Sequence, residues 1–133
     1  QVSSQLSPCS SILYIAGGVG ITACLPYLKK NRDKSAKLLW SNRKSGLLTE
    51  LQPVLAALPS NLLVETSIGG RFDLDAVLSK ELAGSVKTGN GILGVVVCGP
   101  PGMADDVRRK LSQVSTRNVM SRPYVLLDEA FSW

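Results

Sequence analysis

The sequence has no histidine, few aromatic residues and no long apolar run, and each shortage excludes a class of protein. Without histidine, the Ser/His and Cys/His pairs of hydrolytic enzymes cannot be built, and with only three cysteines and no CxxC spacing a zinc site is not expected either. Aromatic residues make up only 5% of the chain, so the basic stripe with interleaved aromatics that binds nucleic acid is not expected. No apolar run reaches the roughly 20 residues of a membrane-spanning helix. We therefore expect no nucleic-acid partner, no metal site and no membrane insertion of this segment.

Cysteine is also sparse. Cys9, Cys24 and Cys98 are odd in number and no two have a CxxC spacing, which favours a reducing compartment over a disulfide framework. Residues 1–8 are polar and lack the basic start of a signal peptide. The chain begins without Met and ends in Phe131-Ser132-Trp133, so we expect a piece cut from a longer protein.

What the sequence does contain is a regular alternation of two patterns in 133 residues that are 44% hydrophobic, enough for one domain core. Short apolar runs predict strands over 11–16, 37–42, 61–67, 92–98 and 124–127. Helical periodicity predicts helices over 23–31, 49–58, 74–82 and 101–114, and the stretch 85–91 is expected to be a loop. Asp73 is expected to cap the third helix. The alternation predicts an α/β fold with a five-stranded parallel sheet flanked by helices on both faces.

Two glycine-rich stretches, AGGVG and CGPPG, follow the first and fourth predicted strands. The carboxyl ends of parallel strands meet at one edge of a sheet, where ligands of such folds bind. The two stretches should therefore open onto the same edge and outline a binding crevice.

The first glycine stretch has the pattern of a phosphate-binding turn. A strand, then Gly17 to Thr22 (GGVGIT), then a helix brings backbone N–H groups and a helix N-terminus to an anion. Thr22 can cap the helix or donate its hydroxyl to a phosphate, and Pro26 is expected in the first helical turn. Gly18-x-Gly20-x-x-Ala23 fits the loose dinucleotide pattern, whereas a Walker A loop is excluded because no Gly-Lys-Ser/Thr follows. A tight turn without a ligand is the alternative.

Basic residues follow the second and third strands. An NAD-specific site would have an acid after the second strand to hold the ribose 2′-hydroxyl, whereas Arg43 and Lys44 suit a 2′-phosphate. Arg71 can supply a second guanidinium from the neighbouring strand. The alternative for each is a solvated surface charge. Together they favour NADPH over NADH.

The second glycine stretch follows Cys98. A small, polarizable residue at that point would let a flat ring lie close to the backbone, and the alternative is an inert buried cysteine. Hydride transfer needs no acid–base residue from the protein, because the cofactor carries the chemistry.

Five motifs in this order, LYIAGGVGIT, WSNRK, GGRFDL, VVVCGPPGM and DEAFSW, resemble the NADPH-binding domain of the ferredoxin–NADP reductase superfamily. The resemblance is greatest to the membrane ferric reductases, of the fungal metalloreductase type, and to the related NADPH oxidases. It covers the chain from about Ser11 onward. It implies a Rossmann-like NADP-binding domain of the ferredoxin reductase type over 11–133, preceded by a linker, 1–10, from a flavin domain.

The resemblance also implies roles for individual residues. The first glycine stretch would cradle the pyrophosphate, Arg43 and Arg71 would hold the 2′-phosphate, and Cys98 with Gly99 would lie beside the nicotinamide. A terminal aromatic, Phe131 or Trp133, would stack on the flavin. The implied catalytic residues are Cys98, Phe131 and Trp133, and the implied cofactor-binding residues are Gly17, Gly18, Val19, Gly20, Ile21, Thr22, Arg43, Lys44, Arg71, Cys98, Gly99, Pro100, Gly102 and Met103.

The parent protein implied by the resemblance is a larger membrane protein, with this segment as a soluble domain at the cytoplasmic face of a plasma or internal membrane. Its flavin domain would hold FAD and partner this segment, and its membrane domain would hold haem, passing electrons to ferric or cupric ions or to oxygen. This segment has no sequence signature of a flavin domain. It also departs from many members of the family at Ala23 and Phe72, two positions at which those relatives carry proline. Two other hypotheses are a non-catalytic NADPH-sensing domain and, with weaker support, a complete single-domain enzyme. As a reductase module, the isolated domain would be inactive.

Overall fold

A computed structural model describes residues 6–42, 46, 50, 53, 56, 62–69, 72–88, 91–117 and 123–129. The helix predicted over 49–58 falls outside the continuous ranges of this description. Among the described residues, no helix has both the length and the apolar character needed to cross a bilayer.

Five parallel strands form one sheet in the order β3-β2-β1-β4-β5. Every predicted strand is present, and its ends lie within two residues of the prediction. The central strand β1 is buried continuously from Ile12 to Ala16, as expected for a strand covered on both faces. The strands are β1 (Cys9–Gly17), β2 (Ser35–Asn42), β3 (Leu62–Ile68), β4 (Ile92–Cys98) and β5 (Tyr124–Asp128).

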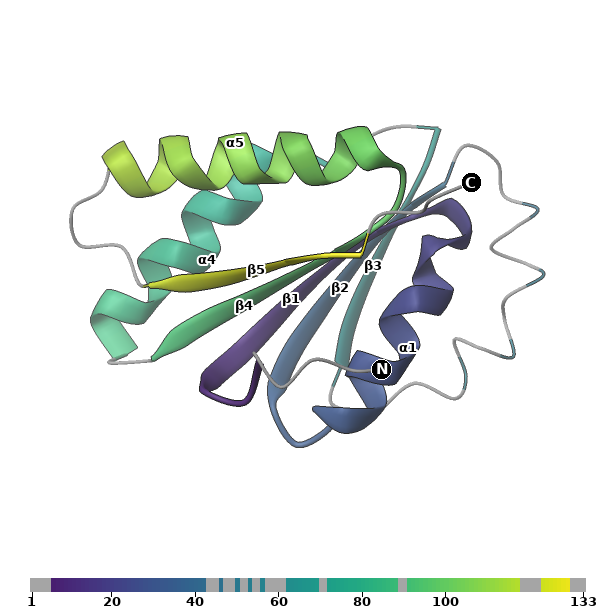
Figure 1. Cartoon of the computed structure of the whole chain (residues 1–133), viewed down its shortest axis with the longest axis horizontal. Coiled ribbons are helices and arrows are strands. Elements are labelled where there is room, and N and C mark those ends of the chain that lie inside the picture. Colours follow the sequence, from purple (N-terminus) through teal and green to yellow (C-terminus); the bar gives the residue numbers. More distant parts are fainter. Residues whose placement is uncertain are drawn as a thin grey trace.

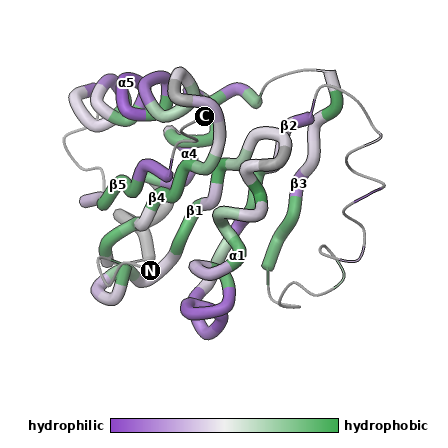
Figure 2. Tube along the Cα trace, turned by 45° about the vertical axis from the view of Figure 1, so that its right-hand side comes forward, coloured by the Kyte–Doolittle hydropathy of each residue, from purple (hydrophilic) through white to green (hydrophobic). Residues whose placement is uncertain are grey.

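Helices cover both faces of the sheet. Helix α1 (Ile21–Lys30) lies on one face, and α4 (Leu74–Thr88) and α5 (Pro101–Arg117) lie on the other (Figure 1). Because strand side chains alternate between faces, β2 sends Trp40 into the core beneath α1 and Leu39 into the core beneath α4 and α5. Figure 2 shows hydrophobic residues along the strands and hydrophilic ones on α5 and at the far end of α1. The predicted fold class, α/β with a five-stranded parallel sheet, is confirmed.

The helix ends differ from the prediction at two places. Helix α1 begins at Ile21, its N-cap is Gly20 rather than Thr22, and Pro26 therefore lies inside the helix. Helix α4 continues to Thr88. The prediction of a loop over 85–91 was therefore wrong for residues 85–88. These four residues contain neither proline nor glycine, and a helix already formed adds one hydrogen bond per further residue. The cap on α4 is confirmed, since Asp73 Oδ1 accepts a hydrogen bond from the N–H of Ala76 at 3.1 Å.

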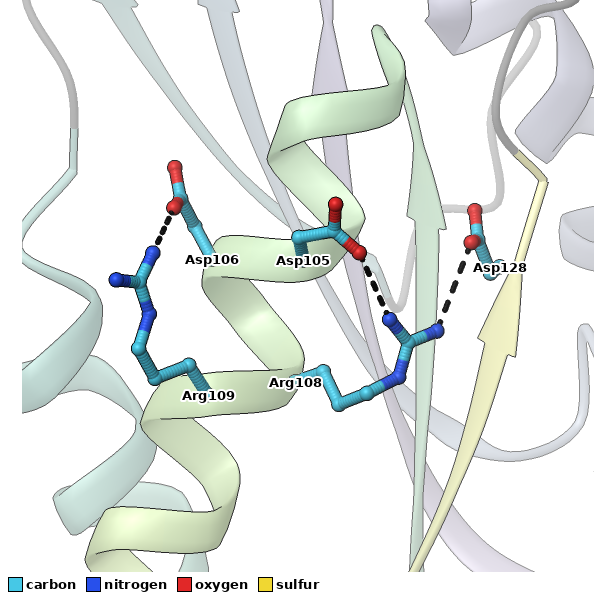
Figure 3. Close-up of polar contacts among 5 residues, drawn as sticks. All are labelled: Asp105, Asp106, Arg108, Arg109 and Asp128. Atoms are coloured by element: carbon cyan, nitrogen blue, oxygen red, sulfur yellow. Dashed lines mark hydrogen bonds and ion pairs between the residues drawn. The ribbon is translucent and has the colours of Figure 1, made fainter.

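Surface ion pairs connect α5 to its neighbours. Arg108 lies between Asp105 on its own helix, at 3.0 Å, and Asp128 at the end of β5, at 3.6 Å (Figure 3). Arg117 pairs with Asp75 of α4 at 2.9 Å. These side chains are partly or largely exposed, so each pair contributes little to stability.

The strand order reverses beside β1. The chain runs outward from β1 through β2 to β3, then returns to place β4 on the other side of β1. In open parallel sheets this reversal is where ligands bind, at the carboxyl ends of the two strands that flank it. Those strands, β1 and β4, are the two that end in the glycine-rich stretches.

Candidate functional site

The first glycine turn joins β1 to α1 and needs glycine at two positions. Gly18 has a φ of 56°, in the left-handed region that side chains disfavour. A Cβ on Gly20 would lie 2.2 Å from the carbonyl oxygen of Cys98. The turn, a single 3-10 turn over Gly18–Gly20, therefore packs directly on the end of β4, as the predicted meeting of the two stretches requires.

The helix that follows the turn is suited to an anion. Within the described helix α1, the first turn contains no acidic residue and Gly20 supplies no side-chain cap. The N–H groups of a first helical turn have no acceptor within the helix and carry partial positive charge. Thr22 is exposed at the second position, whereas the side chain of Ile21 is fully buried. Any ligand contact of Ile21 is therefore through its backbone.

The fully buried indole of Trp40 holds the turn in place from the neighbouring strand. Its Nε1–H donates a 2.7 Å hydrogen bond to the carbonyl oxygen of Gly18. The bond ties the residue with positive φ to β2, which fixes the direction of the turn. Sequence reasoning quoted this residue in WSNRK but gave it no role.

The second glycine turn lies against the first through Met103. A Cβ on Gly17 would be 2.7 Å from the Met103 Cε, and one on Gly99 would be 2.8 Å from its Sδ. The Met103 N–H in turn donates to the carbonyl of Pro100 at 3.0 Å. A Cβ on Gly102 would meet nothing within 4 Å. The structure thus brings Gly17, Gly20, Gly99 and Met103 together at the edge where strand order reverses.

Cys98 ends β4 as predicted, and its side chain points into the core beneath α1. Both Cys98 and Cys24 of α1 are fully buried. The hydrogen bond to Cys98, with burial and the nearby Glu129 charge, raises the pKa of the Cys24 thiol well above its usual range. Burial likewise raises the pKa of the adjacent Tyr14 phenol. Both the Cys24 thiol and the Tyr14 phenol stay protonated at neutral pH, so neither of these two groups supplies a nucleophile.

Glu129 was missed by sequence reasoning. Its N–H donates to the Val97 carbonyl at 2.8 Å, just beyond β5, and its carboxylate accepts a hydrogen bond from the Tyr27 hydroxyl of α1. The carboxylate therefore lies on the α1 side of the edge that carries both glycine turns. The signal available in the sequence was a carboxylate residue directly after the last strand, in the same motif as the terminal aromatic residues.

Asn42, the last residue of β2, was also missed. Its carbonyl oxygen accepts a 2.7 Å hydrogen bond from the N–H of Gly69, beyond β3. Its side chain is buried, and neither amide atom has a partner among the described residues. Five predicted site residues lie outside the described ranges: Arg43, Lys44, Arg71, Phe131 and Trp133. The side chain of Val19 is likewise not described.

Together these features define a class. A parallel sheet with a glycine turn and a helix N-terminus at the reversal of strand order is the architecture of nucleotide-binding α/β domains.

Comparison with known proteins refines that class. Residues 57–112 match the family described as "Ferric reductase NAD binding domain". The match spans β3, α4, β4, the second glycine turn and most of α5, and does not include the first glycine turn. It supports a pyridine-nucleotide-binding module of an oxidoreductase.

The chain matches no curated protein. Among solved structures it is similar to the C-terminal domain of a hydrogenase from Pyrococcus furiosus. That similarity has 16% identity over 88% of this chain and 90% of the other, with a TM-score of 0.49.

Proposed function

We propose that this domain binds NADPH and holds it for hydride transfer to a flavin carried by another domain of the same parent chain. The observation that carries the proposal is the packing of the two glycine turns on each other, with a Gly20 Cβ position only 2.2 Å from the Cys98 carbonyl. The match of 57–112, which includes the second glycine turn, to a ferric reductase NAD-binding family supports the nucleotide-binding part of this proposal.

In the proposed complex the first turn, Gly17 to Thr22, receives the pyrophosphate on backbone N–H groups. Arg43, Lys44 and Arg71 follow β2 and β3 in the sequence and pair with the 2′-phosphate. The nicotinamide end lies next to Cys98 and is bordered by the second glycine turn, with Gly99, Pro100, Gly102 and Met103. Bound NADPH supplies the hydride, so the task of these residues is to position its nicotinamide ring.

Flavin and haem would reside on other parts of the parent chain, with this domain at the cytoplasmic face of a membrane. The residues 11–133 would form the NADPH-binding domain, and residues 1–10 its link to the flavin domain. Phe131 or Trp133 would stack on the flavin. Ferric or cupric ions are the proposed electron acceptors, and oxygen is the acceptor in the oxidase alternative.

The test is calorimetric titration of the chain with NADP⁺ and NAD⁺. We expect tighter binding of NADP⁺, and loss of that preference in Arg43→Ala and in Arg71→Ala, because each removes a cation from the 2′-phosphate. Lys30→Ala is the matched control. It removes one exposed charge at the opposite end of α1 and should leave the preference unchanged.

A folded chain that binds neither nucleotide contradicts the proposal. A chain that binds NADP⁺ but, as part of its parent, does not reduce the flavin on addition of NADPH supports the sensor alternative. Stopped-flow absorbance of the flavin separates those two functions.

A further inference from the structure

Two asparagines are buried among the described residues, and they differ in their hydrogen bonding. Asn31 is 7% exposed and its Nδ2 donates to the Tyr27 carbonyl at 2.9 Å. Asn42 is 5% exposed, yet neither its Nδ2 nor its Oδ1 has a partner among the described residues. Buried side-chain amides are nearly always hydrogen-bonded. The unpaired amide of Asn42 therefore calls for a ligand.

Asn42 lies at the carboxyl edge of the sheet, on the α1 side. It pairs with Ile68 of β3 and comes directly after Ser41, which pairs with Gly17. Strand alternation puts its side chain on the same face as Trp40, the residue that holds Gly18 through its indole. Asn42 is one alternation further along β2 than Trp40, at the edge of the sheet that carries the first glycine turn.

This position corresponds to a defined part of a bound dinucleotide. With the pyrophosphate on the first glycine turn, the adjoining adenosine ribose lies over the end of the second strand. An acid at that point binds both ribose hydroxyls and repels a 2′-phosphate. A neutral amide offers an NH2 group that donates and a carbonyl oxygen that accepts, which match a phosphorylated 2′-oxygen and a free 3′-hydroxyl.

We infer that Asn42 binds the adenosine ribose of NADPH, its Nδ2–H donating to the 2′-phosphate group and its Oδ1 accepting from the 3′-hydroxyl. This inference rests on the proposed function and adds to it a residue that sets nucleotide specificity from β2. No described residue pairs with this amide in the absence of nucleotide, so we assign its contribution to binding and not to folding.

Substitution by leucine, which has the same number and branching of side-chain heavy atoms, separates the two contributions. Asn42→Leu should bind NADP⁺ about tenfold more weakly, because two hydrogen bonds to the nucleotide are lost. Its thermal unfolding midpoint without nucleotide should be unchanged or higher, because the unpaired buried amide is removed. Asn31→Leu is the matched control and should behave oppositely, with a lower midpoint and unchanged affinity per folded molecule.

Asn42→Asp tests the specificity. A carboxylate next to the 2′-phosphate should weaken NADP⁺ binding about 100-fold, while NAD⁺ binding stays within a few-fold of the wild type, since only one of the two nucleotides carries the like charge.

The outcomes distinguish the two proposals. If the wild-type chain binds NADP⁺ and Asn42→Leu binds it equally well, the role of Asn42 is overturned and the proposed function stands. If the folded wild-type chain binds neither nucleotide, both proposals fail.

Discussion

The two faces of the sheet are built from the same strands but from different chemistry. Beneath α4 and α5 the core is aliphatic, with Val95, Val97, Val107 and Leu111 among its buried residues. Beneath α1 the buried side chains include three thiols, two phenols and an indole. Glu129 and the amide of Asn42 lie at the carboxyl edge on this side. One face of the sheet therefore serves mainly to hold the sheet together, while the other also holds polar groups next to the proposed site.

The largest expected effect is on the aliphatic face. Leu111→Ala removes a fully buried side chain from α5 and should lower the free energy of unfolding by about 2–5 kcal/mol. Nucleotide affinity per folded molecule should not change, because Leu111 lies in the core remote from both glycine turns. Urea denaturation and titration of the folded chain measure the two quantities. A large loss of affinity would show that the two faces are not separate in function.

Gly20→Ala tests the contact between the turns. Its Cβ would overlap the Cys98 carbonyl backbone, so we expect about 1–3 kcal/mol of destabilisation and strong loss of nucleotide binding. Gly102→Ala is the matched control at the second turn, where the added Cβ meets nothing within 4 Å. That variant should be neutral or up to about 1 kcal/mol more stable, because alanine favours a helix. Equal destabilisation in the two variants would contradict the packing of the turns.

Trp40→Phe keeps an aromatic ring but removes the donor to the Gly18 carbonyl. We expect about 1 kcal/mol of destabilisation and weaker nucleotide binding, because the turn loses its tie to β2. Tyr14→Phe, on the same face, is the control. The Tyr14 hydroxyl has no partner among the described residues, so its removal should not destabilise the chain. If both variants have wild-type affinity, the indole does not orient the turn.

The smallest expected effect concerns the ion pairs of Asp75 on the outer surface of α4, one of the two helices that cover the aliphatic core. The hydrogen bond from Arg117, with the charges of Arg117 and Lys110, lowers the pKa of Asp75. A carboxyl group whose pKa is lower in the folded state contributes its full stabilisation of the fold at pH values above its unfolded pKa of about 4. That contribution is lost as the pH falls through the pKa of the folded state. In Asp75→Asn the unfolding midpoint should therefore fall slightly at pH 6, while the difference from wild type should vanish on acidification. A difference that persists at the lowest pH would exclude this ion pair as its cause.

Much of the fold could be predicted because the local signals agree with the tertiary structure. The run of apolar residues in β1 is what a strand covered on both faces requires. The Asp73 cap and the apolar side of α4 around Leu78 and Leu82 were also readable. The error at the end of α4 has the opposite cause. The residues after the predicted end of this helix have only weak preferences for helix or loop. Their conformation is therefore decided by the helix that they continue.

The candidate site was predictable only in part. The glycine turns could be predicted because glycine itself indicates a tight turn or a close contact. The roles of Asn42, Trp40 and Glu129 could not be predicted, because they depend on neighbours that are distant in the sequence. Trp40 and Gly18 are 22 residues apart, and Tyr27 and Glu129 are 102 residues apart. No local pattern reports such contacts.

The sequence by itself determined the alternation of strands and helices, the places of the glycine turns and the supply of cations after β2 and β3. Those properties depend on residue type and short-range periodicity, so they can be read along the chain. Only the tertiary structure decided that β4 lies beside β1, that Gly20 rests on the Cys98 carbonyl, and that one face holds the polar groups. These depend on the crossover between strands and on close packing, which bring together residues that the sequence keeps apart.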